Sequence, residues 1–190
     1  MPRLLVEKGY LLTGNASGAE IPTGYIMIED DLITCISGGE TPESIRNQAE
    51  EVIDASGQVV MPGLINSHVH LFQTLIRGLS DNRLLIPWLE QVAFPIYENM
   101  QSDEIHLAVL MGIVENIRGG STAVIDDFTV FQPREGYDAV FGAAKESGIR
   151  YKMARGYSDT GYPDALMETG EQIIASTLEL NENWCKDDPM

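Results

Sequence analysis

The spacing of apolar residues changes along the chain and divides it into two regions. Residues 4–12 and 24–37 hold short apolar runs bounded by turn-forming residues, and two aspartates in the middle of the second run mark a hairpin turn. Beyond these runs, strand-like segments alternate with segments of helical period. The pattern predicts a small region of short strands over residues 1–57 and an α/β region over residues 58–190.

Three strand–helix pairs follow one another in the second region. The continuous apolar run VVMPGLIN, which begins at residue 59, predicts a strand buried on both faces, and STAVID and IRYKMARG predict two more strands. Helical period marks residues 102–118, the segment after Pro133 and a third segment, for which Asp164 is the expected N-cap. This alternation predicts parallel strands joined by helices, in a doubly wound sheet or in a closed barrel.

Composition and charge narrow the classes of protein to which the chain can belong. Its 44% hydrophobic and 22% charged residues are typical of a soluble globular protein, and its net charge of −17 opposes binding to nucleic acid or to an anionic membrane. No apolar stretch approaches the ~20 residues of a membrane span, and the N-terminus lacks the apolar core of a signal peptide. Cys35 and Cys185 form no CxxC pair, so we expect reduced thiols and a cytoplasmic location.

Two of the three histidines lie one residue apart, in the segment NSHVH at the end of the first apolar run. Residues two apart in a strand point to the same side, so His68 and His70 are expected to project together from the carboxyl end of a parallel strand. Two such imidazoles can bind one divalent ion, zinc or iron, although a catalytic zinc site needs at least one further ligand. One histidine could instead cap the strand while the other bonds within a loop. His106 falls inside the first predicted helix, where we expect it to face outward or to pack at the edge of the apolar stripe.

The longer segment VVMPGLINSHVH resembles the first barrel strand of the amidohydrolase superfamily, in which an HxH pair follows PG and an (I/V)(N/D) pair. VIDASGQ before it fits the same family, and FQTLIRGL, PWLEQVAFP and IRGGSTAVIDDF after it resemble the aminohydrolase branch. That branch contains deaminases of cytosine, guanine, 8-oxoguanine, pterins and adenosylhomocysteine-type nucleosides, together with s-triazine hydrolases. The resemblance implies that residues 1–57 are the N-terminal part of a small β-sandwich. It implies that residues 58–190 are the first three β/α units of a (β/α)8 barrel whose remaining units lie outside this chain.

The resemblance also implies a chemistry. It implies one divalent metal, with zinc preferred over iron, held in part by His68 and His70, and a metal-bound water whose lowered pKa supplies hydroxide near neutral pH. The reaction would be hydrolytic deamination, or a dechlorination-like displacement, of an aminated nitrogen heterocycle such as a purine, pterin, pyrimidine or s-triazine. The remaining ligands and the acid–base carboxylates would lie beyond Met190. We therefore expect the 190-residue chain alone to hold zinc weakly and to show no turnover.

Three further residues match pocket positions of the aminohydrolase branch. Gln73 offers an amide that can both donate to and accept from a ring edge, and Trp88 matches a residue that walls the pocket. Arg155 matches an arginine that reaches substrate in the adenosylhomocysteine-type enzymes. We expect all three to open onto the same cavity as the histidine pair. A surface glutamine, a core tryptophan and a strand-end salt bridge are the corresponding structural alternatives.

Three more residues stand out, one for its bearing on the substrate and two as supporting groups. Tyr97 stands where nucleoside-type deaminases carry a glutamate that holds the ribose hydroxyls, which favours a free heterocycle as the substrate. Asp126 and Asp127 close the second predicted strand, and we interpret them as groups that fix a loop or support the site indirectly.

Two other functions stay open at the level of sequence. A cyclic-amide hydrolase of the hydantoinase type would need a carboxylated lysine and a second metal, and the FQTLIRGL segment disfavours it. A non-catalytic half-barrel that pairs with another chain is the second alternative. The H-x-E and PCxxC signature of cytidine deaminases is absent from the sequence. The expected partners are a small heterocyclic substrate and a second copy of the chain in a homo-oligomer, but neither nucleic acid nor a membrane.

Overall fold

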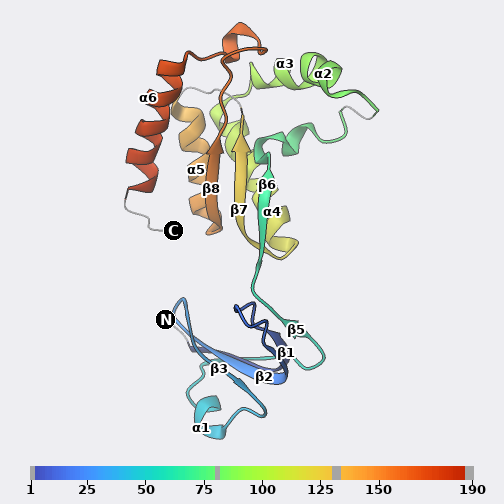
Figure 1. The fold of residues 1–190 in the computed structure, drawn as a ribbon, viewed down its shortest axis with the longest axis vertical. Helices are drawn as coiled ribbons and strands as arrows, with labels where there is room; N and C mark the ends of the chain where they lie inside the picture. The colour runs from blue at the N-terminus through green and yellow to red at the C-terminus, as the bar shows by residue number, and fades with distance from the viewer. Residues whose placement is uncertain (1–2, 80–81, 130–133, 187–190) are drawn as a thin grey trace. The chain divides into compact units, whose positions relative to one another are not determined.

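The computed structural model describes residues 3–79, 82–129 and 134–186. The chain divides into two compact units, Met1–Pro62 and Gly63–Met190, which are drawn in Figure 1 and are described separately. This division falls slightly after the boundary predicted between residues 57 and 58. No helix in the described part of the chain is long and apolar enough to cross a bilayer.

The first unit contains one sheet with the strand order β3-β2-β1-β4, and a fifth strand, β5, also pairs with β1. Its strands are β1 (Arg3–Leu12), β2 (Glu20–Glu29), β3 (Leu32–Gly38), β4 (Glu51–Asp54) and β5 (Val59–Val60). The predicted hairpin is formed by β2 and β3, with Asp30 in the left-handed region at a φ of 57°. The polar segment between β3 and β4 contains a short helix, α1 (Glu43–Arg46). A sandwich needs a second sheet, which the described residues of this unit do not contain, so the sandwich stays a prediction.

Several charged side chains of the first unit form pairs. The carboxylate of Glu7 is buried in the sheet and accepts a hydrogen bond from the guanidinium of Arg46. Lys8 donates to Asp54 at 2.7 Å, and this contact lowers the pKa of Asp54 below its ordinary value. The sheet is thus charged, but each of these carboxylates already has a cationic partner.

The second unit contains a parallel sheet with the order β6-β7-β8 and helices packed on one of its faces (Figure 1). The strands are β6 (Leu64–Val69), β7 (Ser121–Phe128) and β8 (Arg150–Arg155), and the long helices are α4 (Ser102–Arg118), α5 (Arg134–Ser147) and α6 (Gly170–Leu180). Shorter elements connect them: η1 (Leu71–Ile76), α2 (Leu85–Trp88), η2 (Leu89–Ala93), α3 (Phe94–Tyr97), η3 (Asp164–Leu166) and η4 (Asn181–Cys185). The predicted helix over residues 102–118 is confirmed with the same bounds.

The predicted start of the third helix is wrong, because a separate short element precedes the helix. Asp164 begins η3, and Thr169 is the N-cap of α6. The Thr169 side chain accepts the backbone N–H of Gln172, whose side chain in turn accepts the N–H of Thr169. This reciprocal pair satisfies two donors that the helix itself leaves open, which explains why the helix begins there.

The first predicted strand of the α/β region is in fact two strands. Val59 and Val60 pair with β1 in the first unit, and the strand that carries the histidines begins only at Leu64. Pro62 lacks an N–H for a ladder, and Gly63 passes so close to β7 that a Cβ atom there would lie 2.1 Å from Thr122. The strand is also not buried on both faces, because Leu64 and Ile65 are exposed.

The two faces of the second sheet differ sharply in burial. On β7, Val124, Asp126 and Phe128 are buried against a core that α4, α5 and η1 complete, and we call this side the helix-covered face. The alternate residues, among them Asp127, define the open face, where side chains are half-buried or exposed. His106 lies between α4 and α5, where its ring nitrogens contact the carbonyl oxygen of Ala139 and the carboxylate of Glu146.

Candidate metal centre and adjoining cavity

A bulge in β6 decides which way the histidines point. Between Asn66 and Val69, β6 contains one residue more than the facing stretch of β7. Both of these residues therefore lie on the helix-covered face: the Asn66 amide donates to Asn116 of α4 at 2.8 Å, and Val69 packs on the core. Because side chains alternate, His68 and His70 project from the open face. A regular strand would put them on the same side as Asn66.

Three potential ligand atoms converge at this edge of the sheet. One ring nitrogen of His68, one of His70 and one carboxylate oxygen of Asp127 all lie within 4.8 Å of one another. The two imidazoles are nearly perpendicular, with ring centroids 4.9 Å apart. His68 is exposed, while His70 and Asp127 are half-buried. Adjacent parallel strands thus bring nitrogen and oxygen donors together at their carboxyl ends.

The hydrogen bond of His70 fixes its tautomer. The Nδ1 atom lies 2.6 Å from the backbone carbonyl oxygen of Asp127. A carbonyl can only accept, so Nδ1 carries the proton and the neutral ring presents the lone pair of Nε2. Metal-binding histidines are usually held in this way, with the distal N–H donated to a carbonyl or a carboxylate. The ring is therefore oriented by β7 before any ligand arrives.

Asp126 supports the same edge of the sheet from the helix-covered face. Its carboxylate accepts the backbone N–H of Leu71 at 2.9 Å and the hydroxyl of Tyr151 at 2.8 Å. Burial raises the pKa of Asp126 to about 6, and it also raises that of the Tyr151 hydroxyl, with Asp126 as a further cause. Because Leu71 directly follows His70, Asp126 ties the start of η1 to β7 and restrains the backbone of the histidine.

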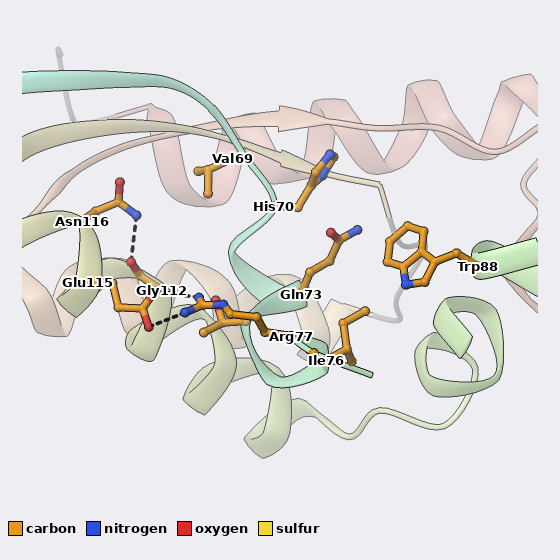
Figure 2. Close-up of a pocket in the computed structure, with 11 residues that line it drawn as sticks. Val69, His70, Gln73, Ile76, Arg77, Trp88, Gly112, Glu115 and Asn116 are labelled. Carbon is orange, nitrogen blue, oxygen red and sulfur yellow. Dashed lines mark hydrogen bonds and ion pairs between the residues drawn. The ribbon is translucent and has the colours of Figure 1, made fainter. Parts of the chain in front are cut away.

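A cavity of about 390 Å³ lies beside β6, η1 and α4, and His70 lines it. Figure 2 shows Gln73 and Trp88 on the same cavity as His70, with the Arg77–Glu115 ion pair, at 2.7 Å, in another part of the lining. His68 is not among the residues that line the cavity. The structure therefore brings together three of the residues selected from the sequence, His70, Gln73 and Trp88.

Tyr97 lies behind Gln73 and does not line the cavity. Its side chain is 2% exposed and packs edge-on against Phe72, and its hydroxyl oxygen accepts a hydrogen bond from the Gln73 amide at 2.8 Å. Burial raises the pKa of the Tyr97 hydroxyl. Tyr97 thus contacts the cavity through Gln73, and its influence on the choice of substrate stays a prediction.

The expectation that Arg155 shares this cavity needs correction. Arg155 ends β8 at the same edge of the sheet as His70, but it pairs in register with Phe128 and therefore points to the helix-covered face. There its guanidinium binds both carboxylate oxygens of Glu168 and the hydroxyl of Ser176. The side chains of Arg155 and Glu168 are only 6% and 1% exposed. The alternation of β8 places Ala154, and not Arg155, on the open face.

Sequence reasoning missed the position of Asp127. The sequence assigned it only an indirect supporting role, whereas both its backbone and its side chain face the histidine pair. A usable signal was present: Asp127 follows the second predicted strand, and the carboxyl ends of neighbouring parallel strands lie side by side. The buried partner of Arg155, Glu168, carried no such signal, because it lies in an irregular segment before α6.

Comparisons with known proteins agree with this architecture. Residues 59–187 match the model of the Amidohydrolase family. A 5-methylthioadenosine/S-adenosylhomocysteine deaminase of Syntrophomonas wolfei is 32% identical over 182 residues, which is 96% of this chain and 39% of that protein. The chain thus spans about two fifths of the length of this curated relative.

Two solved structures share the fold at lower identity. An atrazine chlorohydrolase of Arthrobacter aurescens, determined with zinc, superposes with a TM-score of 0.86 at 24% identity, covering 98% of this chain and 44% of that one. A guanine deaminase of C. acetobutylicum, determined with guanine in its active site, superposes with a TM-score of 0.81 at 22% identity over the same shares of the two chains.

Proposed function

The chain belongs to the amidohydrolase family, and on that premise we propose that the protein is a metal-dependent hydrolase that removes an amino group from a nitrogen heterocycle. One observation carries the proposal. His68 and His70 converge at the carboxyl end of β6, and the carbonyl of Asp127 holds His70 with its Nε2 lone pair free. This is the arrangement that a divalent ion requires of its imidazole ligands.

The residues at this edge fit a divalent metal in their donor chemistry. Two imidazoles and a carboxylate are the ligand types of catalytic zinc, and the atrazine chlorohydrolase with the same fold was determined with zinc. We therefore propose zinc. When bound, such an ion lowers the pKa of a water molecule and supplies hydroxide near neutral pH. His68 and His70 would hold it.

The cavity beside His70 offers both polar and apolar side chains to a substrate. Gln73 donates one amide proton to Tyr97, which leaves the other amide proton and the carbonyl oxygen of the side chain for a ring edge of alternating donors and acceptors. Trp88 adds an apolar wall to the same cavity. We propose that Gln73 and Trp88 orient an aminated heterocycle next to His70. Because Arg155 is buried with Glu168, we do not assign it a contact with substrate.

A purine is the substrate class that the curated relative favours. The S. wolfei protein, at 32% identity, is named for two adenine nucleosides, methylthioadenosine and adenosylhomocysteine. Within this class, Tyr97 favours the free base over the nucleoside as the substrate. The residue is a buried phenol and not a carboxylate that could bind ribose hydroxyls. We further propose a cytoplasmic location, which the free thiols of Cys35 and Cys185 support.

The test is an ammonia-release assay on the protein expressed from its own gene, with the coding sequence around residues 1–190 left intact. Adenine, 5'-deoxyadenosine, guanine, a pterin, cytosine and melamine serve as substrates. We expect zinc-dependent release of ammonia from at least one purine, and none from the His70→Ala variant. Failure of every substrate, or an equal rate from His70→Ala, would contradict the proposed function.

A further inference from the structure

We propose that the carboxylate of Asp127 is a third ligand of the metal held by His68 and His70. This inference rests on the proposed metal site and adds to it a donor from the second strand of the sheet. Asp127 lies on the open face of β7, the side from which both histidines project. The three side chains therefore meet in front of the same edge without any change in the backbone.

The distances allow a common ion. Zinc bonds to imidazole nitrogen and carboxylate oxygen are about 2.0–2.2 Å long, so two donors on one tetrahedral ion are about 3.3–3.6 Å apart. The three ligand atoms lie within 4.8 Å of one another. The widest pair has to close by at most about 1.5 Å, which rotation of the exposed His68 ring and of the Asp127 carboxylate can supply.

Asp127 and its neighbour Asp126 differ in how their oxygens are used. Both oxygens of Asp126 accept hydrogen bonds, from Leu71 and Tyr151, on the helix-covered face. The carboxylate of Asp127 accepts no hydrogen bond and forms no ion pair with the described residues, although it is half-buried beside two imidazoles. Only the backbone carbonyl of Asp127 is engaged, by His70. The oxygens of Asp126 are thus occupied by hydrogen bonds within the fold, whereas the oxygens of Asp127 are available to a cation.

A third ligand changes what the chain can bind. With two imidazoles, an ion keeps mostly water, and the affinity is weak. Two imidazoles and one carboxylate, with an open position for water, form a donor set sufficient for a catalytic zinc ion. The carboxylate also offsets one of the two positive charges in a half-buried position. The two histidines alone predict weak binding, whereas the addition of Asp127 predicts tighter binding by the same 190 residues.

The experiment is a zinc titration of the chain against a chromogenic chelator, with folding checked by circular dichroism. We compare the wild type with Asp127→Asn, Asp127→Glu and His70→Ala, and with Asp159→Asn, which removes an exposed carboxylate of the same unit. We expect one zinc per chain and a loss of affinity of roughly 10- to 100-fold or more in Asp127→Asn. Asp127→Glu should recover part of this loss, and Asp159→Asn should match the wild type.

A second measurement uses the wild type and does not depend on the folding of a variant. In chain labelled with ¹³C at the aspartate carboxyl carbons, zinc should shift the Asp127 signal more than that of any other aspartate. Unchanged affinity in Asp127→Asn, or an unshifted Asp127 carboxyl signal, would overturn the inference while leaving the histidine pair in place. No zinc binding by the wild type, or equal binding by His70→Ala, would overturn both this inference and the proposed metal site.

Discussion

The first sheet of this protein and the carboxyl edge of the second sheet differ in whether their polar side chains have partners. In the first unit, the buried carboxylate of Glu7 is bound by Arg46, and Asp54 is bound by Lys8. In the second unit, His68 and the carboxylate of Asp127 converge on the open face without a hydrogen-bond partner for the converging side-chain atoms among the described residues. A charge that already has its counterion contributes to the fold, whereas donors that converge without one form a site.

The same contrast appears within the second sheet, between its two faces. Asp126 and Arg155 point to the helix-covered face, and each is bound there by neighbouring side chains. His70 and Asp127 point to the open face, where the carbonyl of Asp127 orients the imidazole and both side chains keep free electron pairs. Residues that are adjacent in sequence thus have different roles, because successive side chains of a strand point to opposite faces of the sheet. Four experiments can break or sharpen this comparison.

The largest expected effect is on the core beneath the site. Phe72 is 1% exposed and packs edge-on against Tyr97 and Phe128, with ring centroids 5.0 and 5.2 Å away. Phe72→Ala should lower the free energy of unfolding by about 3–5 kcal/mol, because it removes a buried ring and leaves a cavity. Urea denaturation measures the loss. Hydrogen exchange should place the loss in the second unit, since every member of this core cluster belongs to it; equal deprotection of β1 and β2 would contradict the separation of the two units.

The next effect is on metal affinity. Replacing both His68 and His70 with alanine should weaken zinc binding by roughly 100-fold or more, because no imidazole ligand remains at the edge of the sheet. Isothermal titration calorimetry measures the change. Glu7→Gln in the first unit is the matched control, since it alters a buried carboxylate that already has a partner, and it should leave zinc binding unchanged. A comparable loss in Glu7→Gln would show that the two sheets do not differ as described.

A smaller effect is expected from the supporting carboxylate. Asp126→Ala leaves the N–H of Leu71 and the hydroxyl of Tyr151 without their acceptor in a buried setting, which should cost about 1–3 kcal/mol of stability. Thermal unfolding followed by circular dichroism measures this cost. Tyr151→Phe removes only the hydroxyl and should cost less. A neutral result for Asp126→Ala would show that Asp126 does not tie η1 to β7.

The smallest effect concerns the exposed pair in the first unit. The hydrogen bond from Lys8, with a further contribution from Ser56, lowers the pKa of Asp54 below its ordinary value of 3.8. A lowered pKa contributes stability above the ordinary value, and that stability is lost as the pH falls through the lowered value. Asp54→Asn should therefore flatten only the acid end of the stability profile of this unit, by little, because both side chains are about half exposed. Denaturation between pH 2 and pH 5, at low and high salt, measures it.

In the second unit, the positions of the strands and helices could be predicted from the sequence better than the directions of their side chains. Helical period located the helix over residues 102–118, and apolar runs located β7 and β8, because both patterns reflect burial that is local to one element. The split between Val60 and Leu64 depends on which strand each segment pairs with, and that pairing involves residues far away in the chain. The pattern of apolar residues alone could not assign this pairing.

Only part of the candidate site could be predicted from the sequence, because strand pairing decides which way its side chains point. The i, i+2 spacing was enough to put His68 and His70 on one side of a strand. Their placement on the open face depends on a bulge, which is visible only in the register between β6 and β7. The position of Arg155 depends on the register of β8, and its burial depends on Glu168, which lies in the segment before α6. Spacing predicts which residues lie together on one strand, but the neighbouring strands and helices decide what they face.

Nitrogen-15 NMR of the imidazole rings tests most directly the claim that the carboxyl edge of β6 and β7 is the metal site. The chain has three histidines, so each ring can be assigned and followed during a zinc titration. We predict that zinc shifts one ring nitrogen of His68 and the Nε2 of His70, that Nδ1 of His70 keeps its proton, and that His106 does not respond. Unshifted signals from both His68 and His70, or a response confined to His106, would contradict the account.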